Sequence, residues 1–264
     1  MADIKQIDAG LNQYLRLQTF PVAVRMCESE EELPEGVRIP ERDLGLTISL
    51  CHAITLARRY GWVMAVDKNQ SCFAASISMG FLPIPADVAD GSYQASLGIR
   101  GGSKEEAAAE IEDMPKFESG KYQYALMAPL HRTTFEPHVI LFYANPAQIA
   151  VLLGGYLTGT GTKGGIDINL KTGGCCQTYI TRTMQTDEAK FSILSGGERI
   201  ISNPQDYECT LAIPFSKAEQ TVQGLERGYK GGVSRYPIPG FLRYNSQLPP
   251  GDMKLRSHLL GEDA

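Results

Sequence analysis

Val139-Ile140-Leu141-Phe142-Tyr143-Ala144 is the longest unbroken apolar run of the sequence, and Asn145-Pro146 follows it directly. An apolar run of this length predicts a buried strand. Asn is a preferred N-cap and Pro is favoured at the first helical position, so we expect a helix to start here and to continue to about Leu157. A second apolar run over residues 124–130 predicts another buried strand, joined to the first by a turn over residues 131–137.

The same patterns extend over the rest of the chain. Helices are expected over residues 3–17, 46–60, 72–80, 104–113, 175–184 and 216–228, strands over residues 21–26, 62–66, 190–194 and 208–214, and loops over residues 28–43 and 83–103. No internal repeat or linker-like break in composition divides the chain. We therefore expect one α/β domain over residues 1–264, of the α+β variety, with a mixed sheet flanked by helices and long Gly/Pro-rich loops. The tail over residues 229–264 is expected to be irregular.

Two further helix starts carry a capping prediction. Ser71 precedes the expected helix over residues 72–80 and is a suitable N-cap. Ser216 and Glu219 have the spacing of a capping box, in which the two side chains bond each other's backbone N–H groups.

Composition limits the class of protein. The 264 residues are 43% hydrophobic and 21% charged, close to the globular average, which excludes a wholly disordered chain. The net charge of −5 disfavours a nucleic-acid partner, because such binding depends on cations that neutralise phosphates. No apolar run approaches the about 20 residues of a membrane-spanning helix, and the N-terminus lacks a signal pattern. We expect a soluble, cytoplasmic protein without a nucleic-acid or membrane partner.

Cysteines at two expected helix starts are the strongest chemical feature of the sequence. Cys72 lies at the first, and Cys175 and Cys176 follow Gly173-Gly174 at the second. The first-turn N–H groups and the helix dipole favour an anion there and lower the pKa of a thiol. The glycine pair would let the backbone approach a ligand closely.

The other three cysteines have apolar neighbours. Cys27 and Cys209 lie in strand-like runs and are expected to be core residues. Cys51 lies within the helix expected over residues 46–60 and has the same packing interpretation, but the fold is able to bring it beside the cysteines at the helix starts.

The cysteines therefore allow three interpretations. The first is a thiolate-ligated metal or iron–sulfur site held by Cys51, Cys72, Cys175 and Cys176. The second is thiol chemistry by a nucleophilic and a resolving cysteine. The third is that all of them are ordinary buried thiols. The sequence has no Cys-x2-Cys pair of the kind that structural zinc sites usually show.

A small anionic ligand is a further expectation. The Gly-rich loop over residues 159–165 has backbone N–H groups that could hold an anion, although its lysine is misplaced for the phosphate loop of an ATPase. Lys163, Arg199 and Gly173-Gly174 are expected to bind this anion or to offset the negative charge of a cluster. The Arg58-Arg59 pair is assigned only surface charge or contact with an anion.

Short segments spread over nearly the whole chain carry a family resemblance: Pro21–Val24, Cys51–Ala53, Ala57–Arg59, Cys72–Ala75, Met79–Phe81, Ala128–Leu130, Phe135–Ile140, Asn145–Gln148, Cys176, Gly196–Arg199 and Ala212–Pro214. Together they resemble the domain-of-unknown-function family numbered 169. The resemblance implies a cytoplasmic protein of bacterial and archaeal type, many of whose relatives come from anaerobes, with no characterised activity. The family's recurring cysteines fall on Cys51, Cys72 and Cys176, and Cys175 is an addition to that pattern.

One function and two alternatives follow. The expected function is a cytoplasmic protein with a thiolate-ligated metal or iron–sulfur site, which is redox-active with a redox partner or open to a small anionic ligand. The first alternative is a module that binds a small anionic metabolite without a metal. The second is a homodimer with only structural thiols, in which the tail over residues 229–250 wraps its neighbour. The sequence names neither a substrate nor a reaction.

Overall fold

One mixed sheet forms the centre of the computed structural model, which describes residues 3–98, 102–162, 167–168, 173–232, 234–237 and 248–262. The strand order among these residues is β2-β3-β1-β4-β7-β6-β5. Every neighbouring pair is antiparallel except β5 and β6, which are parallel. The strands are β1 Val22–Cys27, β2 Met64–Val66, β3 Tyr124–Pro129, β4 Val139–Ala144, β5 Asp167–Ile168, β6 Lys190–Ser192 and β7 Cys209–Pro214. The predicted mixed α/β class is confirmed.

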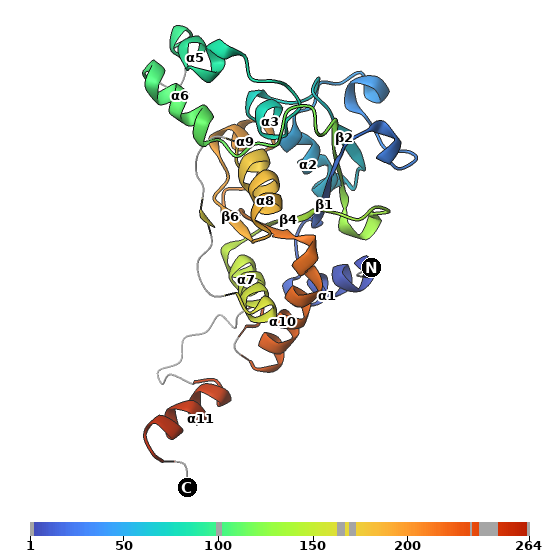
Figure 1. Ribbon diagram of the computed structural model, residues 1–264. Helices are drawn as coiled ribbons and strands as arrows, with labels where there is room; N and C mark the ends of the chain where they lie inside the picture. Colours follow the sequence, from blue (N-terminus) through green and yellow to red (C-terminus); the bar gives the residue numbers. More distant parts are fainter. Residues whose placement is uncertain are drawn as a thin grey trace.

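Helices cover both faces of this sheet (Figure 1). The main helices are α1 Ile4–Leu15, α2 Leu50–Tyr60, α3 Phe73–Ser78, α6 Lys104–Asp113, α7 Pro146–Thr160, the π-helix η5 Gly174–Arg182, α8 Thr183–Thr186, α9 Gly196–Ile201, α10 Ala218–Lys230 and α11 Pro250–Leu259. Shorter turns of helix are η1 Glu30–Glu32, η2 Pro40–Leu44, α4 Ala86–Ala89, α5 Ser92–Ser96, η4 Leu130–Arg132 and η6 Phe215–Lys217. Among the described helices, none combines the length and the apolar character that crossing a membrane requires.

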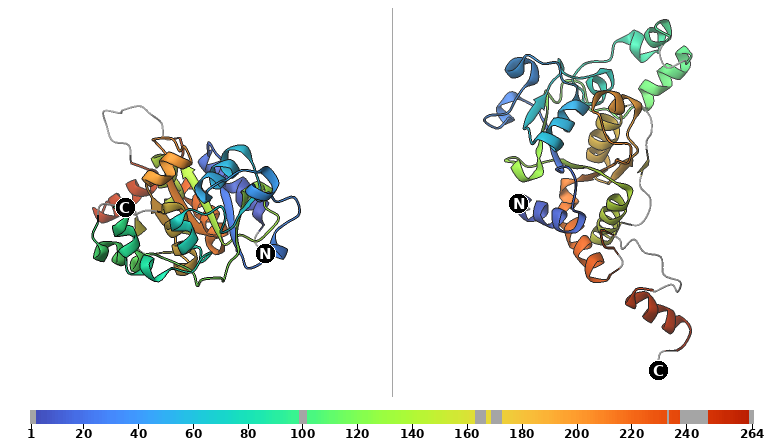
Figure 2. Two further views of the ribbon diagram at one scale, coloured as in Figure 1. Left: turned by 90° about the horizontal axis from the view of Figure 1, so that it is seen from above. Right: turned by 180° about the vertical axis from the view of Figure 1, so that it is seen from behind.

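The continuous apolar run of β4 is explained by burial on both faces. Leu141 and Tyr143 pack into one core cluster with α2, α3 and η5, whereas Ile140 and Phe142 pack into a second cluster with α1, α7 and α10. Figure 2 shows the two groups of helices on opposite sides of the strands. The first of these layers contains the candidate site.

Glycines let α7 and α10 approach closely. A Cβ atom built on Gly224 of α10 would collide with the backbone of Gly155 on α7, and one on Gly159 would collide with the carbonyl oxygen of Gln220. These glycines are required because another backbone, and not a movable side chain, occupies the space. The close contact fixes the layer opposite the candidate site.

The capping predictions for Ser71 and Ser216 are wrong, for a local reason, whereas Asn145 caps α7 as predicted. Cys72, not Ser71, is the N-cap of α3, because the Ser71 hydroxyl lies 2.6 Å from the Ser76 hydroxyl and bonds the Lys68 carbonyl. Ser216 donates its hydroxyl hydrogen to Asp187 at 2.6 Å, and α10 begins after η6 without a side-chain cap.

Three segments predicted as loops or as irregular contain helix. Residues 28–43 include η1 and most of η2, and residues 83–103 include α4 and α5. Val88 of α4 packs against Ile111 and Met114 at the end of α6. The tail over residues 229–264 includes the last residues of α10 and the whole of α11. A proline lies at the start of η2, α4 and α11, and proline is compatible with the first turn of a helix.

Candidate functional site

Three of the six cysteines line one pocket. The pocket has a volume of about 180 Å³ and lies between α2, α3, η5 and α9. Cys51, Cys72 and Cys175 contribute to its wall. Gly173 and Ala74 also line it, with Phe73, Ser195, Gly197, Glu198 and Ile201 around the rest. We call it the thiol pocket. Three of the four cysteines predicted as ligands thus come from separate elements to one place, and Cys176 is not among the lining residues.

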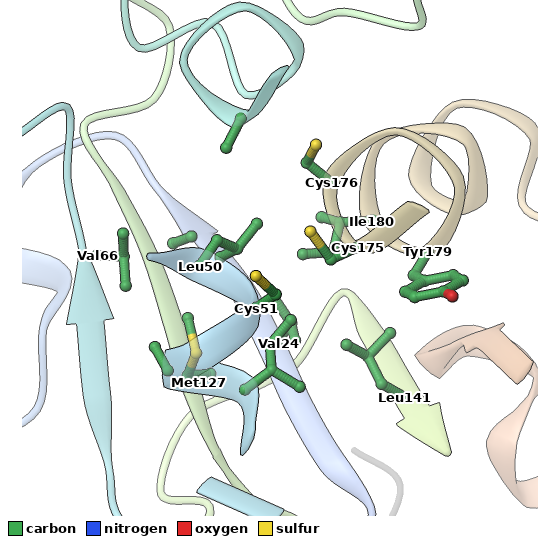
Figure 3. Packing of buried hydrophobic residues seen from close by; sticks show 14 of the residues in the cluster. Val24, Leu50, Cys51, Val66, Met127, Leu141, Cys175, Cys176, Tyr179 and Ile180 are labelled. Atoms are coloured by element: carbon green, nitrogen blue, oxygen red, sulfur yellow. The ribbon is translucent and has the colours of Figure 1, made fainter. Parts of the chain in front are cut away.

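Cys51 reaches the pocket from the first turn of α2. Ser49 caps this helix by accepting the N–H of His52, and its hydroxyl lies 3.3 Å from the Cys51 sulfur. Figure 3 shows Cys51 facing Cys175 across the space between α2 and η5. Cys51 is buried, as expected for a residue that packs in the core. It also lines the pocket, so packing is not its only possible role.

Cys72 lines the pocket from the start of α3. It is the N-cap residue of α3, is half-buried, and makes no capping hydrogen bond with its side chain. The next residues, Phe73 and Ala74, also line the pocket. Cys72 is therefore the most accessible of the three pocket thiols.

Cys175, the third pocket thiol, lies in the first turn of a π-helix. Gly173 has a positive φ of 81° and precedes the π-helix η5. Segments of π-helix are rare and often occur at functional sites. Cys175 is buried and lines the pocket, whereas the adjacent Cys176 bonds the Gly173 carbonyl at 3.3 Å and is not among the lining residues. The turn therefore presents one of the two neighbouring thiols to the cavity.

The raised pKa values of Cys51 and Cys175 favour their neutral forms in the absence of a cation. A hydrogen bond with Cys175, burial, and the charge of Cys175 together raise the pKa of Cys51 far above its usual range. Contact with Cys176 raises the pKa of Cys175, and burial adds to this. The expected lowering of a thiol pKa at this helix start is therefore wrong for Cys175, because the neighbouring thiol and burial outweigh the helix dipole.

Glu198 is a site residue that the sequence analysis missed. Its carboxyl group accepts hydrogen bonds from Tyr143 at 3.3 Å, from Tyr179 at 3.4 Å, and from both the N–H and the hydroxyl of Ser195 at 3.1 Å. Burial raises the pKa of Glu198. The capping-box spacing of Ser195 and Glu198 was the available signal, but a Gly-rich stretch suggests an exposed loop.

Of the described residues predicted to bind an anion, Gly173 lines this pocket and Arg199 does not. Arg199 pairs with Asp206 at 3.3 Å and does not line it, and Lys163 lies outside the described residues. Gly174 packs against the Glu198 carboxyl, where an added Cβ would lie 2.8 Å from an oxygen. Among the described lining residues, the only ionisable groups are the thiols and Glu198, so the pocket itself does not favour an anion.

The remaining cysteines lie elsewhere. Cys27 is buried in β1 and Cys209 is half-buried in β7, and neither lines the thiol pocket. Within the described part of the chain, no three His, Cys, Asp or Glu side chains are arranged to hold a single metal ion. The pocket thiols surround a space and do not converge on one point.

Gly173 allows the chain to turn into η5, and replacing it with a residue that has a side chain is expected to destabilise the fold. A Cβ there would lie 3.0 Å from Ala74 and 3.1 Å from the Cys176 sulfur, at a φ that side chains disfavour. We expect Gly173→Ala to lower the free energy of unfolding by about 1–2 kcal/mol. Gly196→Ala is the matched control, because nothing lies within 4 Å of its added Cβ. Urea unfolding of both variants checks this, and equal stabilities would contradict it.

Thiol alkylation gives a second expected result. In the metal-free protein at neutral pH, iodoacetamide should label half-exposed Cys72 about tenfold or more faster than Cys51 or Cys175, whose buried thiols have raised pKa values. Raising the pH should accelerate labelling of Cys51, since more of it becomes thiolate. Peptide mass spectrometry over time measures each rate. Labelling of Cys175 before Cys72 would be the opposite result.

Comparison with known proteins gives a family but no activity. The family model DUF169, described as uncharacterised ArCR, matches residues 10–224. The uncharacterised protein MJ0308 of Methanocaldococcus jannaschii is 25% identical over 232 residues, which cover 85% of this chain and 95% of that protein. No solved structure matches the chain.

Proposed function

The chain belongs to the DUF169 family, and we propose from the geometry of its thiol pocket that it binds an iron–sulfur cluster or another thiolate-bound metal. Cys51, Cys72 and Cys175 are the proposed ligands. The observation that carries the proposal is that three thiols from three separate elements line one cavity of about 180 Å³. Buried cysteines serving only as core residues do not need to share a cavity.

The electrostatics of the pocket support a bound cation. Cys51 is harder to ionise because Cys175 lies beside it, and Cys175 is harder to ionise because Cys176 lies beside it, so the pKa values of both thiols are raised. A metal reverses this effect, because its positive charge stabilises neighbouring thiolates and displaces their protons. Thiolates favour iron–sulfur clusters, zinc and cuprous copper.

The spacing of the thiols favours a cluster over one ion. A cluster distributes its ligands around several metal atoms, which suits thiols that line a cavity without converging on a point. Three cysteines would leave one coordination position open. A bound cluster of this kind supplies redox or Lewis-acid chemistry.

The protein side chains around that open position have a defined role. Tyr143, Tyr179 and Ser195 hold the Glu198 carboxyl in place on the pocket wall. It is the only carboxyl group among the described lining residues, so it is the group expected to orient a hydrogen-bond donor on a molecule entering the pocket.

Reconstitution tests the proposal. Metal-free protein is mixed with ferrous iron, sulfide and a thiol reductant without oxygen, and visible absorption is recorded after the excess is removed. We expect the wild-type chain and Cys209→Ser to retain a broad visible absorption, and Cys51→Ser and Cys72→Ser to lose most of it. Absence of absorption in the wild type, or its full retention in both pocket variants, would refute the assignment.

A further inference from the structure

A second pocket lies at the other end of α2. It has a volume of about 230 Å³, and its described lining includes Arg38, Tyr60, Gly61, Trp62 and Arg132. Cys51 stands in the first turn of α2 and Gly61 is its C-cap, so the two pockets are about 15 Å apart along the helix. We call it the arginine pocket.

Hydrogen bonds join the three chain segments that line the arginine pocket. The Arg38 N–H donates to the Val63 carbonyl at 3.2 Å, and the Ala65 N–H donates to the Arg38 carbonyl at 3.0 Å. These bonds join the segment before η2 to the start of β2. On the third wall, the Arg132 guanidinium at the end of η4 donates to the Gly61 carbonyl. The pocket is therefore built from fixed segments and needs no rearrangement to form.

Both guanidinium groups keep most of their donors available. An arginine carries five N–H donors. Among the described residues, Arg132 uses one of them on Gly61, and the Arg38 side chain makes no hydrogen bond. Arg38 instead lies over the Trp62 ring, with its central carbon 4.6 Å from the ring centroid. Stacking of this kind leaves the N–H edges of the guanidinium free to bind a ligand.

Neither arginine is paired with a carboxylate in the described part of the chain. Arginines near Arg38 in the sequence do have partners, since half-buried Arg25 pairs with Glu32, and exposed Arg42 pairs with Glu30. The chain has 30 acidic and 25 basic residues, so an excess of cations does not explain two unpaired arginines in one pocket. Their positive charge is available for an anion.

We propose that the arginine pocket binds a small oxyanion, a carboxylate or a phosphate, carried on a planar ring. Two guanidinium forks match the oxygens of such a group. Tyr60, which is 68% exposed, and Trp62 offer aromatic surface for the ring. The volume lies below the range of about 300–1,000 Å³ for drug-sized ligands, which limits the ligand to a small metabolite. The anion predicted from the sequence is thus assigned to residues other than those first expected.

Trp62 makes the test specific to this site. It is the single tryptophan of the sequence, so its indole N–H gives one resonance, and that resonance reports on the floor of the pocket. The full chain is titrated with benzoate and phenyl phosphate, which separate the two oxyanions. Benzamide is the neutral counterpart of benzoate, and acetate is its counterpart without a ring.

The expected result is a saturable shift with benzoate or phenyl phosphate, and binding at least about tenfold weaker for benzamide, since charge-assisted hydrogen bonds are lost. Arg38→Gln and Arg132→Gln should each weaken anion binding by about tenfold, and Arg42→Gln, outside the pocket, should not. Equal binding of benzoate and benzamide by the wild-type chain, or no saturable shift with either anion, would overturn the proposal. This comparison does not depend on whether the variants fold.

Discussion

Replacing Arg58 by methionine is expected to lower the free energy of unfolding by about 3–5 kcal/mol. Arg58 is fully buried, and it holds Glu208, which is 3% exposed, by two parallel hydrogen bonds of 2.7 and 3.0 Å. The guanidinium also lies 4.3 Å from the centre of the Tyr143 ring. Without Arg58, the buried Glu208 carboxylate keeps the Gln205 N–H at 2.8 Å and a longer contact of 3.6 Å with Arg59. The loss is large because the buried carboxylate then lacks its closest cation.

A double variant distinguishes the loss of the Arg58–Glu208 charge pair from the loss of packing around Arg58. Arg58→Met combined with Glu208→Gln removes both charges and keeps an amide oxygen for the Gln205 N–H, which donates to Glu208 at 2.8 Å. We expect the double variant to recover more than half of the loss. Arg42→Met is the surface control, and its urea midpoint should stay close to that of the wild type. An Arg58→Met protein as stable as the wild type would contradict the buried pair.

The effect of Arg58 also depends on pH in a defined direction. Burial alone would raise the pKa of Glu208, but its hydrogen bonds with Arg58 and the charge of Arg58 leave it below the usual value of 4.5. A carboxyl group with a lowered pKa stabilises the fold above its unfolded-state pKa, and this stabilisation is lost as the pH falls through the folded-state pKa. The difference in unfolding free energy between the wild type and Arg58→Met should therefore narrow below pH 4.5.

The second large effect distinguishes two neighbouring cysteines. Cys175→Ser is expected to lose its iron and sulfide, whereas Cys176→Ser is expected to retain them. Cys175 lines the thiol pocket, and Cys176 bonds the Gly173 carbonyl, a contact that a serine hydroxyl can also make. The two residues are adjacent and both are buried, so each is a matched control for the other.

Iron and acid-labile sulfide in the two purified variants measure this difference. The family resemblance implies a recurring cysteine at Cys176, so the experiment also distinguishes that expectation from the ligand that the pocket geometry favours, Cys175. Loss of iron in Cys176→Ser with full retention in Cys175→Ser would mean that the other face of η5 supplies the ligand.

Features encoded by continuous local patterns could be predicted from the sequence. The apolar runs of β3 and β4 and the Asn145 cap of α7 appear where the sequence places them. In each case a strong local preference agrees with burial in the final fold. The gathering of Cys51, Cys72 and Cys175 was a hypothesis from cysteine positions, and the fold does bring them to one pocket.

Features that depend on distant partners could not be predicted. Arg58 has the pattern of a cation at the exposed end of a helix, and its burial depends on Glu208, 150 positions later. Glu198 follows two glycines in the sequence, and its role depends on hydroxyl groups from β4 and η5. Ser71 failed as a cap because a nearby serine competes for its hydroxyl. Sequence spacing contains no information about such contacts.

The decisive measurement for the proposed cluster is the metal and acid-labile sulfide content of the wild-type chain, purified without oxygen. We predict iron and sulfide in roughly equal amounts, with a broad visible absorption that disappears on exposure to a chelator and oxygen. A folded, colourless protein that contains neither iron nor another thiolate-bound metal would contradict it.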